Sequence, residues 1–145
     1  KKMGTYYVPT VIAGRSTADS SKIPNYYPEM VAKKAAAIGP VIQGTFAKAY
    51  KAGVKIAFGT DAGVFGHGKN GYEFVLMNEG GMPVLEAIKS ATVTAADLLG
   101  QSDLIGSIEV GKAADIIAVP GDPVADVKLM TKVNFVMKDG KVYKN

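Results

Sequence analysis

The residues best placed to do chemistry are those of the turn Gly59-Thr60-Asp61-Ala62-Gly63. An apolar run, residues 54–58, ends abruptly in this turn, so a buried strand would carry a single carboxylate, Asp61, at its C-terminal tip. The small residues around Asp61 leave room for another group to approach it. In α/β enzymes the C-terminal ends of the strands carry the chemistry, which makes Asp61 the first candidate.

Two interpretations of Asp61 follow from the residues alone, and the local sequence favours neither. In the first, the carboxylate acts on a substrate as a general acid and base. In the second, it caps the following loop through an Asx-type hydrogen bond to the backbone. A second polar candidate is Arg15, the one arginine of the chain, which could pair with a carboxylate.

The elements that position Asp61 form a βαβ unit. Residues 6–13 are aromatic and β-branched and predict a strand, with Pro9 as an irregularity, and residues 14–28 predict a polar loop. From Pro28 to Gly53 apolar residues recur at three- and four-residue steps, which predicts an amphipathic helix that Gly39-Pro40 breaks or kinks. The strand 54–58 follows, and such units build parallel sheets.

The remainder divides into a helical part and a β part. Three short helices are predicted first, and strands separated by Gly, Pro and Asp turns follow from about Ser102. Asp139-Gly140 is a strong hairpin signal. The predicted helices are Tyr72–Glu79, Pro83–Ser90 and Thr94–Leu99; the predicted strands are Ser107–Val110, Asp115–Val119, Val133–Met137 and Lys141–Tyr143, with a helical turn within Val124–Met130.

Neither sheet is complete by itself. A two-stranded parallel sheet has two open edges and cannot cover its own apolar face. We therefore expect this chain to be the C-terminal part of a larger protein, or to fold against a complementary chain.

Composition excludes several classes of function. The 145 residues carry a formal charge of +4, but the lysines are dispersed rather than clustered with aromatics, so we expect no nucleic-acid partner. No apolar run is long enough for a membrane span, and no membrane partner is expected. The absence of cysteine excludes disulfides and zinc–thiolate sites, and fits the cytoplasm or the periplasm equally.

Several short motifs follow one another along the chain: the Asp61 turn, Gly66-His67-Gly68, Glu79-Gly80-Gly81-Met82, Glu86-Ala87-Ile88, Ala91-Thr92, Ala95–Gly100, Ile105–Ile116 and Phe135–Val142. This ordered series resembles the amidohydrolase superfamily from about Thr5 to the C-terminus. Within it, Asp61-Ala62-Gly63 with His67-Gly68 and Asn70 resembles the imidazolonepropionase-like enzymes described as Xaa-Pro dipeptidases, or prolidases. Histidine-pathway imidazolonepropionases and nucleoside-type deaminases look different after the equivalent aspartate.

The resemblance implies an α/β fold: the last part of a metal-dependent TIM barrel in residues 1–101, and C-terminal strands of a small β-sandwich in residues 102–145. It implies one or two divalent metal ions, usually zinc, held by several histidines, often a carboxylated lysine, and one aspartate. Only the aspartate has a counterpart here, Asp61, which would be metal ligand and proton shuttle.

The same resemblance implies the partners. The substrate would be a small, peptide-like molecule, a dipeptide or an N-acyl amino acid, and a homo-oligomer is compatible with the family. His67 lies in a loop that borders the substrate pocket in related enzymes, so it either binds substrate or is a surface histidine without a role. Without the missing part, the chain would be inactive or would serve only as a structural partner.

Overall fold

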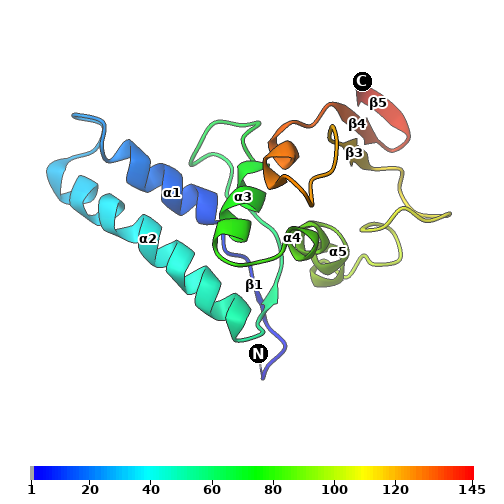
Figure 1. Cartoon of the computed structure of the whole chain (residues 1–145), viewed down its shortest axis with the longest axis horizontal. Coiled ribbons are helices and arrows are strands. Elements are labelled where there is room, and N and C mark those ends of the chain that lie inside the picture. Colours follow the sequence, from blue (N-terminus) through cyan, green and yellow to red (C-terminus); the bar gives the residue numbers. More distant parts are fainter. Residues whose placement is uncertain (1) are drawn as a thin grey trace.

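The computed structural model describes residues 2–145, which form two small sheets and several helices (Figure 1). In chain order the elements are β1 (Tyr6–Tyr7), α1 (Val11–Ser20), α2 (Glu29–Lys51), β2 (Lys55–Ile56), α3 (Tyr72–Glu79), α4 (Val84–Ala91), α5 (Val93–Leu98), β3 (Ile116–Ala118), the 3₁₀ helix η1 (Val127–Thr131), β4 (Phe135–Lys138) and β5 (Lys141–Lys144).

The first sheet is the parallel pair β1–β2, which confirms the predicted βαβ arrangement. The ladder continues past β2, because the Ala57 N–H donates to the Tyr7 carbonyl at 3.1 Å. Both strands are shorter than predicted. Beyond Ala57 the backbone turns to α4 instead, and the Phe58 N–H donates to the Ser90 carbonyl at 3.0 Å.

The segment after β1 differs from the prediction. Residues 11–13 do not continue a strand, and residues 14–20 are not loop, because together they form α1. Thr10, with φ of 45°, turns the chain into the helix. The apolar run that suggested a strand is the buried first turn of this helix, and a run so short has no period that separates the two.

Helix α2 runs without a break through Gly39-Pro40, so the predicted break is wrong. Pro40 removes one backbone donor, but both Pro40 and Ala36, whose carbonyl loses that donor, are exposed, and water can satisfy the group. The predicted end is confirmed. Gly53, with φ of 71°, donates to the Tyr50 carbonyl, and the next amide donates to the Ala49 carbonyl, which is a Schellman motif.

Helices α1 and α2 lie side by side and cross at small residues (Figure 1). Gly39 is buried at this crossing, where a Cβ on it would lie 2.8 Å from the Ala18 Cβ and 3.2 Å from the Gly14 carbonyl oxygen. The absence of a side chain at Gly39 therefore sets how closely the two helices approach.

Helix α3 lies at the centre of the molecule (Figure 1) and is buried over five consecutive residues, Glu73–Met77. A helix without a polar face is typical of a core element. The core cluster around it brings together residues that are far apart in the sequence. It consists of Val11, Ile12, Phe46, Ile56, Phe74, Leu76, Met77, Met82, Ala87 and Met130.

The second sheet is antiparallel, in the order β3–β4–β5. Asp139 and Gly140 both have positive φ, 49° and 75°, as a two-residue type I′ turn requires, so the predicted hairpin is confirmed. The strand predicted at Ser107–Val110 is wrong. No strand in the part of the chain that the structure describes pairs with this segment, and Ile108 is 83% exposed.

No helix within residues 2–145 combines the length and the apolar character that crossing a bilayer requires.

The crossing of α1 and α2 gives a prediction with a control in the same helix. Gly39→Ala should lower the free energy of unfolding of the full-length protein by about 1–3 kcal/mol, because the new methyl overpacks the crossing. Gly44→Ala should raise it by about 0.5–1 kcal/mol, because nothing lies within 4 Å of a Cβ there and alanine favours the helix. Thermal unfolding of both variants measures the difference, and equal effects would contradict the packing account.

Candidate functional site

Asp61 lies in the turn that follows β2, with its backbone in the left-handed region at φ of 53°. Its carbonyl accepts from the Val64 N–H at 3.3 Å, and its side chain is exposed. Across residues 2–145 no hydrogen bond involves the Asp61 carboxylate, so the capping interpretation lacks the bond that it needs. The carboxylate is open to a ligand, as the catalytic interpretation requires.

The loop that carries Asp61, residues 61–71, is closed at its base. The Asn70 side-chain amide donates to the Thr60 hydroxyl with Nδ2 and Oγ1 at 2.8 Å. Gly71 follows and packs against the carbonyl oxygen of Met130 in η1, so closely that a side chain at Gly71 would clash with it. The loop therefore leaves the sheet and returns to α3 between two fixed points.

His67 is on the same loop as Asp61 and is exposed. Glycines flank it, and nothing lies within 4 Å of a Cβ built on Gly66 or Gly68, so the loop around His67 is open to solvent. The structure thus places both candidates on one loop, and both side chains are exposed.

Glu73 is a polar residue of this region that we did not predict. It lies in α3 with 0% of its surface exposed. Its Oε1 accepts from the Val11 N–H at 2.9 Å and its Oε2 from the Ile12 N–H at 2.7 Å. Burial raises the pKa of Glu73 to about 7, against the opposing effect of these two hydrogen bonds. The available signal was its place directly before four consecutive apolar residues, Phe74–Met77, in a predicted helix.

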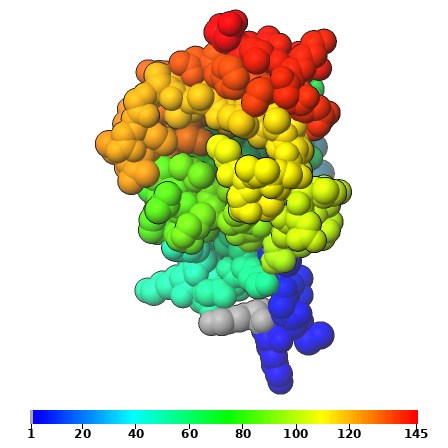
Figure 2. Space-filling view, turned by 90° about the vertical axis from the view of Figure 1, so that its right-hand side faces the viewer, coloured from blue at the N-terminus to red at the C-terminus, as the bar shows by residue number. Residues whose placement is uncertain are grey.

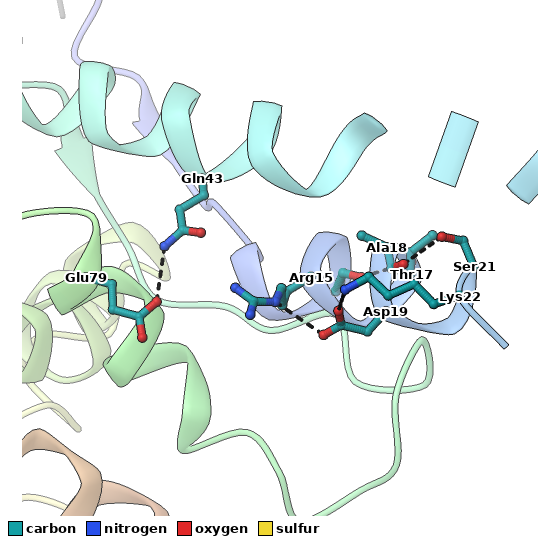
Figure 3. A network of polar contacts seen from close by, with 9 residues as sticks. Arg15, Thr17, Ala18, Asp19, Ser21, Lys22, Gln43 and Glu79 are labelled. Carbon is teal, nitrogen blue, oxygen red and sulfur yellow. Dashed lines mark hydrogen bonds and ion pairs between the residues drawn. The ribbon is translucent and has the colours of Figure 1, made fainter. Parts of the chain in front are cut away.

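Arg15 lies in α1 and not in the polar loop predicted for residues 14–28. Figure 3 shows its partner on the same helix, Asp19, with 3.2 Å between Nε and Oδ2. Lys22 pairs with the same carboxylate at 2.6 Å. Arg15 is therefore engaged on the surface of α1.

A cavity of about 480 Å³ lies away from Asp61. It is bounded by α4, α5 and the segment 105–117, which Figure 2 shows in yellow on this face of the molecule. Its lining is mostly apolar and holds none of the residues of the Asp61 loop. Cavity size alone therefore does not point to the candidate site.

The residues present do not make a metal centre on their own. Within the described range no three histidine, cysteine, aspartate or glutamate side chains are grouped as ligands. Zinc sites in proteins use three or four such ligands. Asp61 is an exposed carboxylate, a side-chain type that zinc accepts as a ligand.

A family model and a solved structure both match this chain along nearly its whole length. The model of the amidohydrolase family matches residues 2–143. A crystal structure of a Xaa-Pro dipeptidase with methionine bound in its active site is 56% identical, with a TM-score of 0.93; the match covers 98% of this chain and 35% of that one.

Two curated relatives are named for activities that differ from each other and from that of the dipeptidase. Ochratoxinase of Aspergillus niger is 41% identical over 100 residues, which is 66% of this chain and 21% of the relative. The 5-methylthioadenosine/S-adenosylhomocysteine deaminase of Thermoanaerobacter pseudethanolicus is 34% identical over 141 residues, 84% of this chain and 32% of the relative. The chain thus spans about a third or less of the length of these proteins.

The buried Glu73 carboxyl predicts a pH dependence of stability. Because burial raises its pKa from 4.5 to about 7, the folded protein binds a proton in this interval that the unfolded chain has released. The free energy of unfolding should therefore fall as pH rises from 4.5 to 7, by at most about 1.4 kcal/mol per pH unit from this group.

Glu73→Gln should lack this slope. The test compares the unfolding of full-length wild type and variant at pH 5 and pH 8, where the difference between the two proteins should change with pH. Parallel profiles would show that Glu73 does not titrate in this interval.

Proposed function

This chain belongs to the amidohydrolase family, and from that premise we propose that the intact protein hydrolyses the amide bond of a dipeptide or an N-acyl amino acid. The observation that carries the proposal is the match to a Xaa-Pro dipeptidase along nearly the whole chain. The exposed carboxylate of Asp61 at the end of a parallel strand supports it, since this is where α/β enzymes place their catalytic groups.

The proposal extends to the architecture of the intact protein. β1 and β2 are the last two strands of a TIM barrel in residues 1–101, and β3–β5 belong to a small β-sandwich in residues 102–145. The rest of the barrel comes from the N-terminal part of the protein or from a complementary chain. The exposed apolar residues of α2, Met30 at 73% and Val41 at 58%, support a covering partner, and a second copy of the chain is the alternative.

In the proposed reaction Asp61 moves a proton. A divalent metal ion, zinc in most of the family, lowers the pKa of a water molecule when it is bound. The Asp61 carboxylate accepts a proton from the attacking water and later donates it to the nitrogen of the leaving amine, so that the amine departs neutral. The small residues beside Asp61 leave space for a substrate carbonyl.

A second candidate reaction is hydrolysis at a ring, either of a cyclic amide, as in imidazolonepropionases, or of an exocyclic amine. It is favoured by the deaminase relative, which matches more of this chain than ochratoxinase does. A non-catalytic role as a structural partner is the remaining alternative. Assays of the full-length protein on dipeptides, a cyclic amide and 5-methylthioadenosine distinguish these alternatives. Hydrolysis of dipeptides alone supports the first reaction, hydrolysis of either ring compound supports the second, and hydrolysis of none supports the structural role.

The role of Asp61 predicts a large loss of activity in one variant. Asp61→Asn in the full-length protein should lower kcat for dipeptide hydrolysis by about 10²- to 10⁴-fold, because the amide cannot take the proton of the attacking water. Asp103→Asn, which changes another exposed carboxylate, should leave kcat unchanged. Equal activities of the two variants would contradict the role of Asp61.

His67 should act on binding rather than on the chemical step. His67→Ala should raise KM by about tenfold with kcat retained, since it removes a contact that substrate and transition state share. Lys69→Ala, a change of another exposed side chain of the same loop, is the control and should alter neither constant. If His67→Ala matches the control, His67 is a surface residue without a role.

A further inference from the structure

We propose that Asn70 and Glu73 are positioning residues that hold Asp61 in place through a continuous series of hydrogen bonds, from the tip of β2 to the first turn of α1. The inference rests on the proposed function, since it concerns the geometry of the same carboxylate. We call this series the Thr60–Asn70–Glu73 relay.

The first step of the relay closes the loop that carries Asp61 and His67. The bond from Asn70 to Thr60, 2.8 Å long, joins the two ends of that loop. Phe65, in the middle of the loop, is half-buried and packs against the hydrophobic core. Nothing lies within 4 Å of a Cβ on Gly63, Gly66 or Gly68, and the other residues from 61 to 70 are exposed. Phe65 therefore restrains the middle of the loop, and the bond at the base restrains the segment next to Asp61, because Thr60 is the residue directly before Asp61.

The second step connects the base of the loop to α3. The Asn70 carbonyl accepts from the Glu73 N–H at 3.1 Å, and the neighbouring Tyr72 N–H donates to the Lys69 carbonyl at 3.0 Å. These two bonds form the first turn of α3, which is otherwise fixed by the core. Asn70 therefore uses its side chain toward the strand tip and its backbone toward the central helix.

The third step connects α3 to α1. Helix α1 has no side-chain cap of its own, and Thr10, the residue before it, is in the left-handed region. The first amides of a helix need acceptors, and here those of Val11 and Ile12 both donate to the Glu73 carboxylate. Glu73 thus caps α1 from a position 62 residues away in the sequence.

The relay joins the two segments that leave the parallel strands at the same end. The segment after β1 leads into α1, and the segment after β2 carries Asp61. They also touch directly, because Gly59 lies against the Val8 side chain with no space for a Cβ. Asp61 is therefore held relative to both strands, and a change at Asn70 or Glu73 should alter its position without removing any group that contacts substrate.

The test uses the full-length protein with three variants, Asn70→Ala, Thr60→Val and their combination. Each single change breaks the same bond, so each should lower kcat by about tenfold with little change in KM, and the double variant should be no worse than the singles. Glu73→Gln keeps the shape but offers one acceptor for two amides, and should lower kcat as well. Asn78→Ala removes an amide of the same type, bonded to the Met82 carbonyl, and should leave kcat unchanged.

Hydrogen–deuterium exchange of the peptide covering residues 61–71 provides a readout that does not depend on activity. Exchange should rise in Asn70→Ala and Thr60→Val and stay at the wild-type level in Asn78→Ala. If the wild type hydrolyses none of the substrates but exchange rises as expected, the proposed function fails and the relay stands. If exchange is unchanged, the relay is wrong.

If exchange rises but kcat per folded molecule is unchanged, Asn70 does not position Asp61, and the inference is overturned.

Discussion

The fold around the candidate site depends on one buried interaction, the Glu73 carboxylate against the first turn of α1. Removing a carboxylate from water is costly unless its oxygens accept hydrogen bonds. Here both oxygens do, and in return two helix amides that have no other cap are satisfied. The cost of burial remains visible in the raised pKa of Glu73.

This interaction explains why the elements near Asp61 have the form they do. Val11 and Ile12 form the first turn of α1, and the amides of both residues point at the Glu73 carboxylate, while β1 is only two residues long. Glu73 lies in α3 at the start of the buried stretch Glu73–Met77. The Asp61 loop starts just after β2 and ends at the first turn of α3. Its two ends are joined by the bond from Asn70 to Thr60, while most of its residues are exposed.

The sequence was sufficient for those features that local chemistry determines. Asp139-Gly140 specifies its turn, Gly53 ends α2, and the bounds of Tyr72–Glu79 were predicted as observed. It was insufficient where tertiary contacts decide. Residues 11–13 look like a strand until α3 and Glu73 are placed against them, and Pro40 is tolerated because its side of α2 is exposed. Asp61 was visible as a strand-tip carboxylate, but Glu73 was not, because its partners lie more than sixty residues away.

We propose that Asp61 is a metal ligand and proton acceptor in a site whose other ligands come from outside this chain. The most direct test is a crystal structure of the full-length protein with anomalous scattering data collected at the zinc edge. We expect an anomalous peak about 2.0–2.2 Å from a carboxylate oxygen of Asp61, with histidines from the rest of the protein as the other ligands. A peak coordinated without Asp61, or no metal in a protein that hydrolyses dipeptides, would contradict it.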